Sequence, residues 1–380
     1  MNKVIYLDNA STTKLEPGLL EFLEPYKQSF FANPSSVHQL GQQALREYEK
    51  CKNDVLRLLN LNDHQVIFTS GATESNNLAI KGVCFKYQNR GKHIITSAYE
   101  HPSVLEAFRQ LEKEFDFEVT YLVPDNSGKI TVDNVKTALR KDTILVSVMA
   151  VNNEIGVINP VEEIGELLNQ YPKVVFHVDV AQAVGKLDKP INFSKVDLIT
   201  LSAHKIHGPV GVGALIKRKK IDLLPLLSGG GQEYNLRSGT NDLLGAIAFK
   251  HVLEDSLKNQ KERFAHVSEL ASVIIDYLNK HQDLFSLNSP SPVNPYIINF
   301  SSLTKKGSVI VEALSNHGVM VSSVSACHSS KEKGSYVVKS LGKSDAISNN
   351  TIRVSLDYMN NKEEIIEFLS ILDKVIGEIR

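Results

Sequence analysis

A lysine that could act as a nucleophile follows a short apolar segment near the middle of the chain. Asp197–Ser202 has the residue types of a buried strand, and Lys205 follows it in the stretch S-A-H-K-I-H-G-P. The nearest like charge downstream is Lys217. A lysine held away from water can have its pKa lowered until its free amine reacts with a carbonyl group. Taken alone, the pattern favours an ordinary lysine on a surface loop, so its role depends on the residues around it.

An aspartate ends a second candidate strand upstream. Val174–Val178 is rich in β-branched residues and predicts a central strand, with Asp179 at its C-terminal end. The chain between the two strands is long enough for a crossover, so they can run parallel and bring Asp179 and Lys205 to the same carboxyl edge, where α/β sheets bind ligands. A lysine paired with an aspartate there indicates pyridoxal phosphate (PLP), whose pyridine nitrogen the aspartate keeps protonated. The alternative for Asp179 is a helix N-cap.

A possible phosphate site follows the candidate strand Gln65–Ser70. Gly71, Ala72 and Thr73 connect this strand to a helical segment. Free backbone N–H groups and the helix dipole attract an anion at such a helix start, and the small residues let a phosphate approach closely. An ordinary turn capped by Thr73 or Ser75 is the alternative.

Two further strand ends carry polar side chains. His93–Ser97 predicts a strand, and His101 follows it, where an imidazole could stack on a flat cofactor and relay protons. A structural histidine is the alternative. Thr143–Ala150 leads to Asn152 and Asn153, which could donate to a ring oxygen or shape a turn.

The C-terminal part of the chain adds a thiol and a guanidinium group. Cys327 lies in a polar loop, Ser322–Gly334, where His328 and Lys331 could favour its thiolate form. The sequence around Cys327 favours a catalytic over an incidental role. Arg353 lies in an alternating strand pattern and could hold a substrate carboxylate through two hydrogen bonds, or be an exposed strand arginine.

The elements that position these residues alternate between strand and helix from residue 65 to 216, which predicts a mostly parallel sheet covered by helices. Val210–Ile216 should run antiparallel to Asp197–Ser202, because the loop that carries Lys205 is too short for a helical crossover. A long helical region covers Asn241–His281, and a small α+β domain follows Pro290–Pro295.

Composition indicates an ordinary globular protein. The 380 residues carry a formal net charge of −1, which gives no indication of a nucleic-acid partner or a membrane surface. The three cysteines, Cys51, Cys84 and Cys327, are far apart and predict neither a disulfide framework nor a metal site. No signal peptide or membrane-spanning run is visible, so we expect a cytoplasmic protein.

Eight short motifs carry a family resemblance: Y-L-D-N-A-S-T-T, T-S-G-A-T-E-S-N-N-L-A-I-K-G, E-H, V-N-N-E-I-G, H-V-D-V-A-Q, S-A-H-K-I-H-G-P, R-S-G-T and S-A-C. In this order they resemble the class V aminotransferases and, more narrowly, the cysteine desulfurases of the NifS/IscS type. The resemblance implies the α/β type I PLP-dependent transferase fold, with a mostly parallel seven-stranded sheet, helices on both faces and a smaller α+β domain. It also implies a homodimer with its active site at the subunit interface. We expect a large PLP-binding domain at 15–255 and a small domain formed by 1–14 and 256–380.

The same resemblance assigns a role to each matching position. It implies that Lys205 forms the Schiff base with PLP, that Asp179 contacts the ring nitrogen and that His101 stacks on the ring. The ring hydroxyl would be contacted by Asn153 and Gln182. The phosphate would be held by Ala72, Thr73, Ser202 and His204, and by Thr240 from the other subunit. Asn33 and Arg353 would bind the substrate carboxylate, and Cys327 would be the nucleophile.

The implied reaction converts L-cysteine to L-alanine and leaves a persulfide on Cys327. Sulfur-acceptor proteins for iron–sulfur cluster assembly, tRNA thiolation or cofactor synthesis are the expected partners. No permanent metal is expected, although Cys327 could transiently bind a nascent cluster. Two departures from the family matter: Val324 replaces a glycine and could stiffen the loop, and the sequence ends at Arg380, without the tail that docks a scaffold protein.

Other activities remain open at this stage. A selenocysteine lyase or another class V PLP-dependent aminotransferase would keep the cofactor without needing the thiol. A sulfur-delivery scaffold without turnover is a third alternative, although Lys205, Asp179 and His101 are all present.

Overall fold

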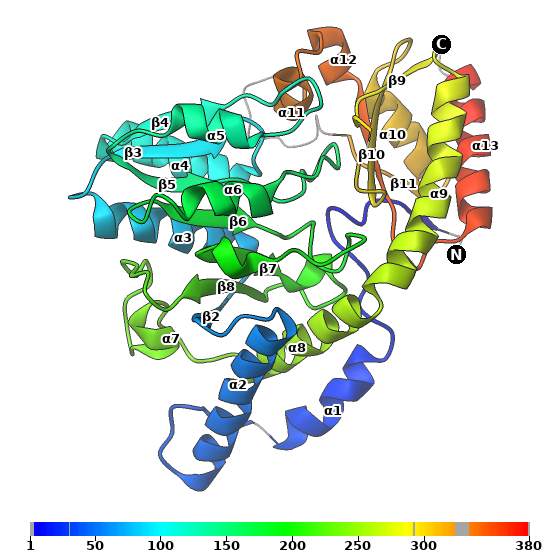
Figure 1. Cartoon of the computed structure of the whole chain (residues 1–380). Helices are drawn as coiled ribbons and strands as arrows, with labels where there is room; N and C mark the ends of the chain where they lie inside the picture. Colours follow the sequence, from blue (N-terminus) through cyan, green and yellow to red (C-terminus); the bar gives the residue numbers. More distant parts are fainter. Residues whose placement is uncertain (1–3, 30, 292, 324–333, 379–380) are drawn as a thin grey trace.

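A seven-stranded mixed sheet forms the centre of the larger part of the molecule (Figure 1). The computed structural model describes residues 4–29, 31–291, 293–323 and 334–378. In spatial order the strands are β2 (His64–Thr69), β8 (Gly213–Arg218), β7 (Leu198–Ser202), β6 (Val175–Asp179), β5 (Thr143–Ser147), β3 (His93–Ser97) and β4 (Glu118–Leu122). β8 runs antiparallel to both neighbours, and all the other pairs are parallel. The predicted fold class is confirmed.

Helices cover both faces of this sheet because successive strand residues enter two separate cores. Ile94 packs on one side and Ile95 on the other, as expected for strands buried on both faces. The first core is covered by α3 (Ala72–Tyr87) and α4 (Pro102–Phe115). The second is covered by α2 (Gln39–Leu58), α5 (Val132–Ala138), α6 (Val161–Leu168) and α8 (Leu243–Lys258).

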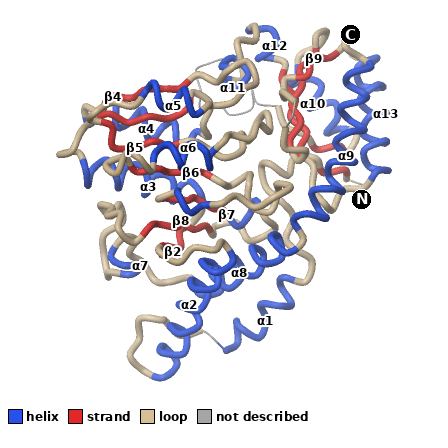
Figure 2. The backbone as a smooth tube through the Cα atoms, in the orientation of Figure 1, coloured by secondary structure: helices blue, strands red, loops and turns tan. Residues whose placement is uncertain are grey.

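The smaller part lies to the right in Figures 1 and 2 and contains two short sheets. One sheet pairs β10 (Ile297–Ser302) antiparallel with both β12 (Thr351–Ser355) and β9 (Phe285–Leu287), and the other pairs β1 (Ile5–Tyr6) in parallel with β11 (Val319–Met320). The helices here are α9 (Gln260–Lys280), α10 (Gly307–Asn316), α11 (Tyr336–Ser340), α12 (Asp345–Asn349) and α13 (Lys362–Glu378). The domain boundaries expected at 14/15 and 255/256 stay predictions.

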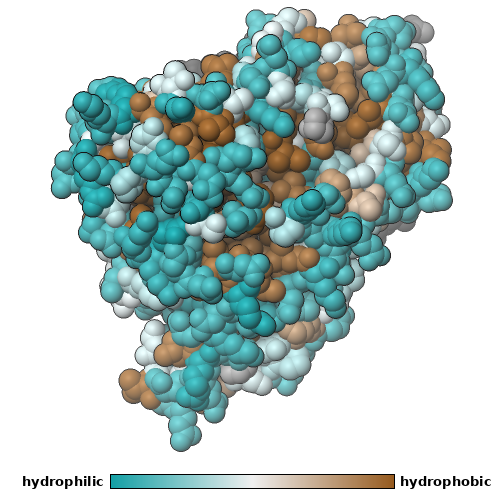
Figure 3. Space-filling model, viewed as in Figure 1, coloured by the Kyte–Doolittle hydropathy of each residue, from teal (hydrophilic) through white to brown (hydrophobic). Residues whose placement is uncertain are grey.

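The remaining elements are short or peripheral. They are α1 (Leu19–Ser29), α7 (Gln232–Asn235) and the 3₁₀ turns η1 (Phe193–Lys195) and η2 (Ala203–Lys205). In the view of Figure 3 the rim of the molecule is mainly hydrophilic, and hydrophobic residues are more frequent across its middle. No helix in the described ranges is both long enough and apolar enough to span a bilayer.

Two sequence-based predictions needed adjustment. The strand after Lys205 is antiparallel to its neighbour, as predicted, but it begins at Gly213 because residues 210 and 211 form a turn. The long helical region is two helices, which meet at Asn259. The short elements β9, α11 and α12 were not predicted, since segments of three to five residues carry too little periodicity.

Candidate active site

Lys205 and Asp179 lie at the carboxyl edge of the large sheet, on neighbouring strands. Asp179 ends β6 and is paired in register with Thr200 of β7. The 3₁₀ turn after β7 then places Lys205 just beyond the edge. Its Nζ donates to the main-chain oxygens of Ala10 and Ser11, both at 2.7 Å. The parallel pairing expected from the sequence is therefore present, and the segment 8–13 closes over the lysine.

The electrostatic surroundings of Lys205 favour a free amine. Burial is the main cause that lowers its pKa to about 7, and the positive charges of Lys186 and Arg353 act in the same direction. The negative charges of Asp179 and Asp8 oppose this shift. A substantial fraction of the amine is therefore uncharged at neutral pH, as a nucleophilic or basic lysine requires.

Asp179 belongs to a buried hydrogen-bond network. The Nδ2 of Asn76 donates to Asp179 Oδ2 at 2.8 Å and to Ser103 Oγ at 2.9 Å. Ser103 Oγ in turn lies 2.8 Å from His101 Nδ1. The other oxygen of Asp179 accepts from the backbone N–H of Ala181 at 2.9 Å, so the aspartate also caps the turn that follows it. These contacts fix the orientation of the carboxylate and link it to the imidazole.

His101 is the N-cap residue of α4 and is held in one tautomer. Its Nδ1 accepts from the backbone N–H of Ser103 at 3.1 Å, which leaves the proton of the neutral ring on Nε2. Burial lowers the pKa of His101, and the positive charge of Lys205 adds to this effect. The imidazole is therefore neutral at physiological pH, and it can stack on a ring or donate one proton from Nε2.

The start of α3 and the end of β7 form a cradle for an anion. Gly71 is the N-cap of α3, has φ 147° and supplies no side-chain cap, so Ala72 and Thr73 begin the helix with open N–H groups. Gly213 pairs in register with Thr69 and with Ser202, which brings the two ends together.

An unsatisfied hydroxyl group marks the same place. Ser202 Oγ is buried and has no hydrogen-bond partner among the described residues. His204 lies beside it, with Nδ1 3.3 Å from Thr12 Oγ1, and burial together with the charges of Lys205 and Lys186 lowers its pKa to about 4. An uncapped helix start and an orphaned hydroxyl fit the phosphate of PLP.

Gln182 faces the segment 8–13, and Asn153 lies next to Arg353. Gln182 Nε2 donates to the Ala10 carbonyl at 2.8 Å, the same oxygen that Lys205 contacts. Asn153 Oδ1 is buried without a partner in the described part of the chain. An amide that shares a carbonyl with Lys205 and a second amide next to Arg353 are both of a type that can contact a ring oxygen.

Arg353, on β12, reaches the site from the smaller part. Its Nη2 donates to Asp8 Oδ1 at 2.9 Å and to Ser11 Oγ at 2.7 Å, and Nη1 donates to the Asn153 carbonyl at 3.0 Å. Its Nε is buried and has no hydrogen-bond partner among the described residues. The guanidinium is thus positioned next to Lys205, with one donor still free for a ligand.

The nucleophile expected from the sequence, Cys327, and its neighbour Val324 lie outside the described residues. The described residues on either side are fixed to the site: Ser322 exchanges backbone hydrogen bonds with Arg353.

A second hydrogen bond attaches the described residues that follow residues 324–333 to the site. Ser335 Oγ donates to Glu154 Oε2 at 2.5 Å, and Glu154 directly follows Asn153. Burial raises the pKa of Glu154 to about 7, against the lowering effects of the Ser335 hydrogen bond and the Arg353 charge. Both flanks of the Cys327 segment therefore contact residues of the site.

Two expected site residues lie apart from this group in the single chain. Asn33 is exposed and its Oδ1 accepts from the backbone N–H of Ser35 at 2.9 Å. Thr240 is exposed in the loop before α8. No hydrogen bond within the described ranges connects either residue to the sheet edge.

Sequence reasoning missed several residues that hold the site together, namely Asp8, Ser11, Asn76, Ser103 and Lys186. All but Lys186 lie in or beside motifs quoted above, such as Y-L-D-N-A-S-T-T and T-S-G-A-T-E-S-N-N. Their side chains contact residues distant in sequence, so no local spacing could reveal the pairing.

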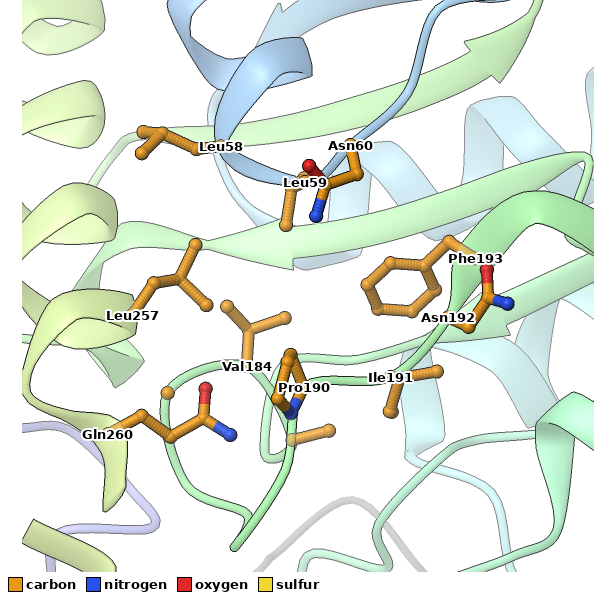
Figure 4. Close-up of a pocket in the computed structure, with 12 residues that line it drawn as sticks. Leu58, Leu59, Asn60, Val184, Pro190, Ile191, Asn192, Phe193, Leu257 and Gln260 are labelled. Carbon is orange, nitrogen blue, oxygen red and sulfur yellow. The ribbon is translucent and has the colours of Figure 1, made fainter. Parts of the chain in front are cut away.

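A cavity of about 190 Å³ lies elsewhere, next to the turn that carries Gln182 (Figure 4). It is lined by Leu58, Leu59, Asn60, Ala183, Val184, Gly185, Pro190, Ile191, Asn192, Phe193, Leu257 and Gln260. None of the candidate site residues is among them, and its mainly apolar wall offers no group for acid–base chemistry.

Comparison with known proteins gives consistent matches over the whole chain. The family model for aminotransferase class-V matches residues 5–368. A cysteine desulfurase IscS from Dictyoglomus turgidum is 39% identical over 381 residues, covering 100% of this chain and 96% of that protein. A NifS/IcsS protein homolog from Lactobacillus delbrueckii subsp. bulgaricus is 40% identical over 98% of this chain and 97% of its own length.

Solved structures agree with these matches. A NifS-like protein superimposes with a TM-score of 0.91 at 31% identity, covering 99% of this chain and 100% of its own. The structure of SspA in complex with cysteine matches with a TM-score of 0.79 at 33% identity, covering 94% of this chain and 99% of its own.

Proposed function

The chain belongs to the class V aminotransferase family and is a cysteine desulfurase of the IscS/NifS type, and from this premise we propose that it uses PLP bound at Lys205 to convert L-cysteine to L-alanine and retains the sulfur as a persulfide on Cys327. The family is PLP-dependent. The observation that carries the proposal is the placement of a partly buried lysine and an aspartate at the carboxyl ends of two neighbouring parallel strands.

The residues of the chain supply binding and proton transfer. When bound, PLP acts as an electron sink for the electron pair left when the substrate loses its Cα proton. We propose that Asp179, held by Asn76, keeps the pyridine nitrogen protonated, and that His101 lies against the ring. The N–H groups at the start of α3 and the hydroxyl of Ser202, which has no partner in the described part of the chain, would hold the phosphate.

Lys205 is proposed to remove the Cα proton of the substrate and to return it later. Its amine is uncharged for a large part of the time at neutral pH, because burial and like charges lower its pKa to about 7. Arg353, adjacent to the lysine, is proposed to hold the substrate carboxylate through its guanidinium group.

The sulfur step is proposed to use the Cys327 thiolate. The thiolate attacks the sulfur of the bound cysteine, so an S–S bond forms while the substrate's C–S bond breaks. The electron pair of the broken bond stays with the substrate, whose carbon takes up a proton to give L-alanine. Support comes from the family and from Ser322 and Ser335, which attach the flanks of the Cys327 segment to Arg353 and Glu154.

A homodimer and a protein that accepts the sulfur are part of the same proposal. Asn33 and Thr240 are exposed in the single chain, which suits residues that serve the site of a second copy. Delivery of sulfur to an iron–sulfur scaffold, a thiolation enzyme or a cofactor-synthesis enzyme, and a cytoplasmic location, also stay predictions.

The test is to incubate the PLP-loaded enzyme with L-cysteine, to measure L-alanine and to locate any persulfide by peptide mass spectrometry. We expect one persulfide on Cys327, and loss of sulfur transfer in Cys327→Ser. Cys51→Ser is the matched control, because burial raises the pKa of that thiol to about 12 and makes it unreactive. Sulfur release that survives in Cys327→Ser would contradict the proposal and favour a lyase that does not use the thiol.

A further inference from the structure

Lys186 is a buried lysine that the proposed reaction does not use. Only 5% of its surface is exposed, and its Nζ donates to Gln182 Oε1 at 3.3 Å. No carboxylate of the described residues lies within ion-pair distance of it. Asp357, whose negative charge acts on Lys186, is itself paired with His207 Nε2 at 3.0 Å. The Tyr296 ring, whose centroid is 6.0 Å from Nζ, is a second and weaker partner. A buried ammonium group held by one neutral acceptor and one aromatic ring is costly, so its presence calls for a role.

Hydrogen bonds connect Lys186 to Lys205. Lys186 donates to Gln182 Oε1, and Gln182 Nε2 donates to the Ala10 carbonyl at 2.8 Å. Lys205 Nζ donates to the same carbonyl at 2.7 Å. Since Lys186 can only donate, it forces the oxygen of the Gln182 amide toward itself and the NH₂ group toward Ala10 and the site.

The turn that carries Lys186 has little freedom to move. Gly185 has φ +74°, and a Cβ built there would lie 2.7 Å from Ser256 Cβ on α8. The carbonyl of Leu187 accepts from Gln260 Nε2 at 2.7 Å. The ammonium group is thus held in place by packing on both sides, and a fixed charge acts on Lys205 more than a mobile one would.

Positive and negative groups near Lys186 and Lys205 shift the pKa values of the two lysines in opposite directions. The charged or titratable groups that act on or respond to Lys205 are Lys186, Arg353, Asp179, Asp8, His101 and His204. Burial lowers the pKa of Lys186 to about 8, the negative charge of Asp357 opposes this shift and the positive charge of Arg353 adds to it, so Lys186 is mainly charged at pH 7. Its charge adds to the burial that lowers the pKa of Lys205. A second cation beside a reactive lysine is a known way to populate the free amine.

We propose that Lys186 is a positioning residue for the reaction at Lys205: its buried ammonium group holds the Gln182 amide in one orientation and places a second fixed positive charge at the far end of the hydrogen-bonded chain that leads through Gln182 and the Ala10 carbonyl to Lys205 Nζ. This inference rests on the proposed function, because it assigns Gln182 and Lys205 to the reacting centre. Lys186 itself touches neither substrate nor cofactor in this scheme.

The test measures the protonation of Lys205 directly. Full-length protein freed of PLP is labelled with a small amine-reactive reagent over a range of pH, and peptide mass spectrometry follows the modification of Lys205. In Lys186→Met we expect the midpoint of labelling to rise by about one pH unit, because one repelling charge is gone. Lys186→Arg keeps the charge and should keep the midpoint. An unchanged midpoint in a folded Lys186→Met protein would overturn the inference.

A control and a second readout separate this inference from neighbouring explanations. Lys217→Met removes another buried lysine, whose Nζ donates to backbone carbonyls at the opposite end of the sheet, and should leave the midpoint unchanged. If Lys186→Met does not fold, Lys186→Gln takes its place. In the PLP-bound enzyme, the pH midpoint of the visible absorbance should shift upward in Lys186→Met and be restored in Lys186→Arg. Labelling needs neither PLP nor L-cysteine, so it remains decisive even if the desulfurase proposal fails.

Discussion

The two ends of the seven-stranded sheet both carry buried cations, but the surroundings of these cations differ. At the amino end of β7, Lys217 donates to the carbonyls of Arg218, Lys219 and Ile221. Arg218 forms ion pairs with Asp63 and with Asp197, the latter at 2.9 Å. Each of these cations has an anionic or carbonyl partner within the protein, which is typical of a cluster that stabilises the fold.

The carboxyl end keeps charges and polar atoms that the protein does not fully satisfy. Lys186 and Lys205 repel each other, and Ser202 Oγ, Asn153 Oδ1 and Arg353 Nε are buried without a hydrogen-bond partner among the described residues. Such groups cost stability unless a ligand supplies the missing partners. At the amino end, the two buried atoms of the described residues without a hydrogen bond, Arg218 Nε and His64 Nδ1, each still lie close to a carboxylate, Asp197 at 2.9 Å and Asp63 at 2.6 Å. The difference is therefore not the burial of charge but the neutral oxygens of Ser202 and Asn153, which have no partner among the described residues.

The largest effect should come from Lys205. Lys205→Met should lower kcat/KM for L-cysteine by at least about a thousandfold, because the base and the attachment point of PLP are both lost. The same variant should raise the Tm of the PLP-free protein near about pH 6. The folded-state pKa of Lys205 is depressed to about 7, so burying its charged form costs stability below that value, and the cost fades as the pH rises toward the ordinary lysine pKa.

Calorimetry of the unchanged protein and of Lys205→Met at several pH values measures whether the substitution raises or lowers Tm. A gain in Tm that shrinks between about pH 6 and about pH 10 is the expected result. A Tm that falls equally at every pH would mean that Lys205 stabilises the fold, as Lys217 does, and the contrast between the two ends would be wrong.

Asp179 should give the second-largest effect. In Asp179→Ala the pyridine nitrogen loses its partner, and we expect kcat to fall by about a hundredfold, with an altered visible spectrum of the bound PLP. Steady-state kinetics and absorbance measure both. Normal kcat in Asp179→Ala would show that the carboxylate only caps the turn at Ala181.

The amino end provides the opposite case. Arg218→Ala breaks the partly buried pairs with Asp63 and Asp197 and should destabilise the protein by about 2 kcal/mol, a value reduced for partial solvent screening. The kcat of the folded fraction should not change. Urea denaturation gives the free energy of unfolding, and a drop in kcat without a loss of stability would break the comparison.

The smallest change in free energy should come from Asn76, which donates a hydrogen bond to Asp179 without touching the substrate. Asn76→Ala should lower kcat by about tenfold, since the carboxylate loses one charge-assisted hydrogen bond. Asn77→Ala is the matched control: the side chain of that half-buried neighbour donates to the Thr73 carbonyl and not to Asp179. Equal kcat values for the two variants would remove Asn76 from the positioning network.

Much of the fold could be predicted because it depends on local patterns. Short apolar segments in the sequence indicate the alternating strands from β2 to β8. The antiparallel direction of β8 follows because the loop before it is too short for a crossover. The split of the long helical region at Asn259 was not visible, since apolar periodicity continues on both sides. Boundaries such as Gly213 depend on pairing with β2 and β7, which no local signal contains.

The sequence by itself determined the alternating strands and helices, the order of the motifs, and the placement of Asp179 and Lys205 at strand ends, because these follow from residue type and spacing. Only the tertiary structure decided that Asn76 holds Asp179 and that, among the described residues, the Ser202 hydroxyl has no hydrogen-bond partner and Lys186, beside Gln182, has no carboxylate partner. These properties arise from contacts between distant segments and from the loss of water on burial, and neither can be read from a linear pattern.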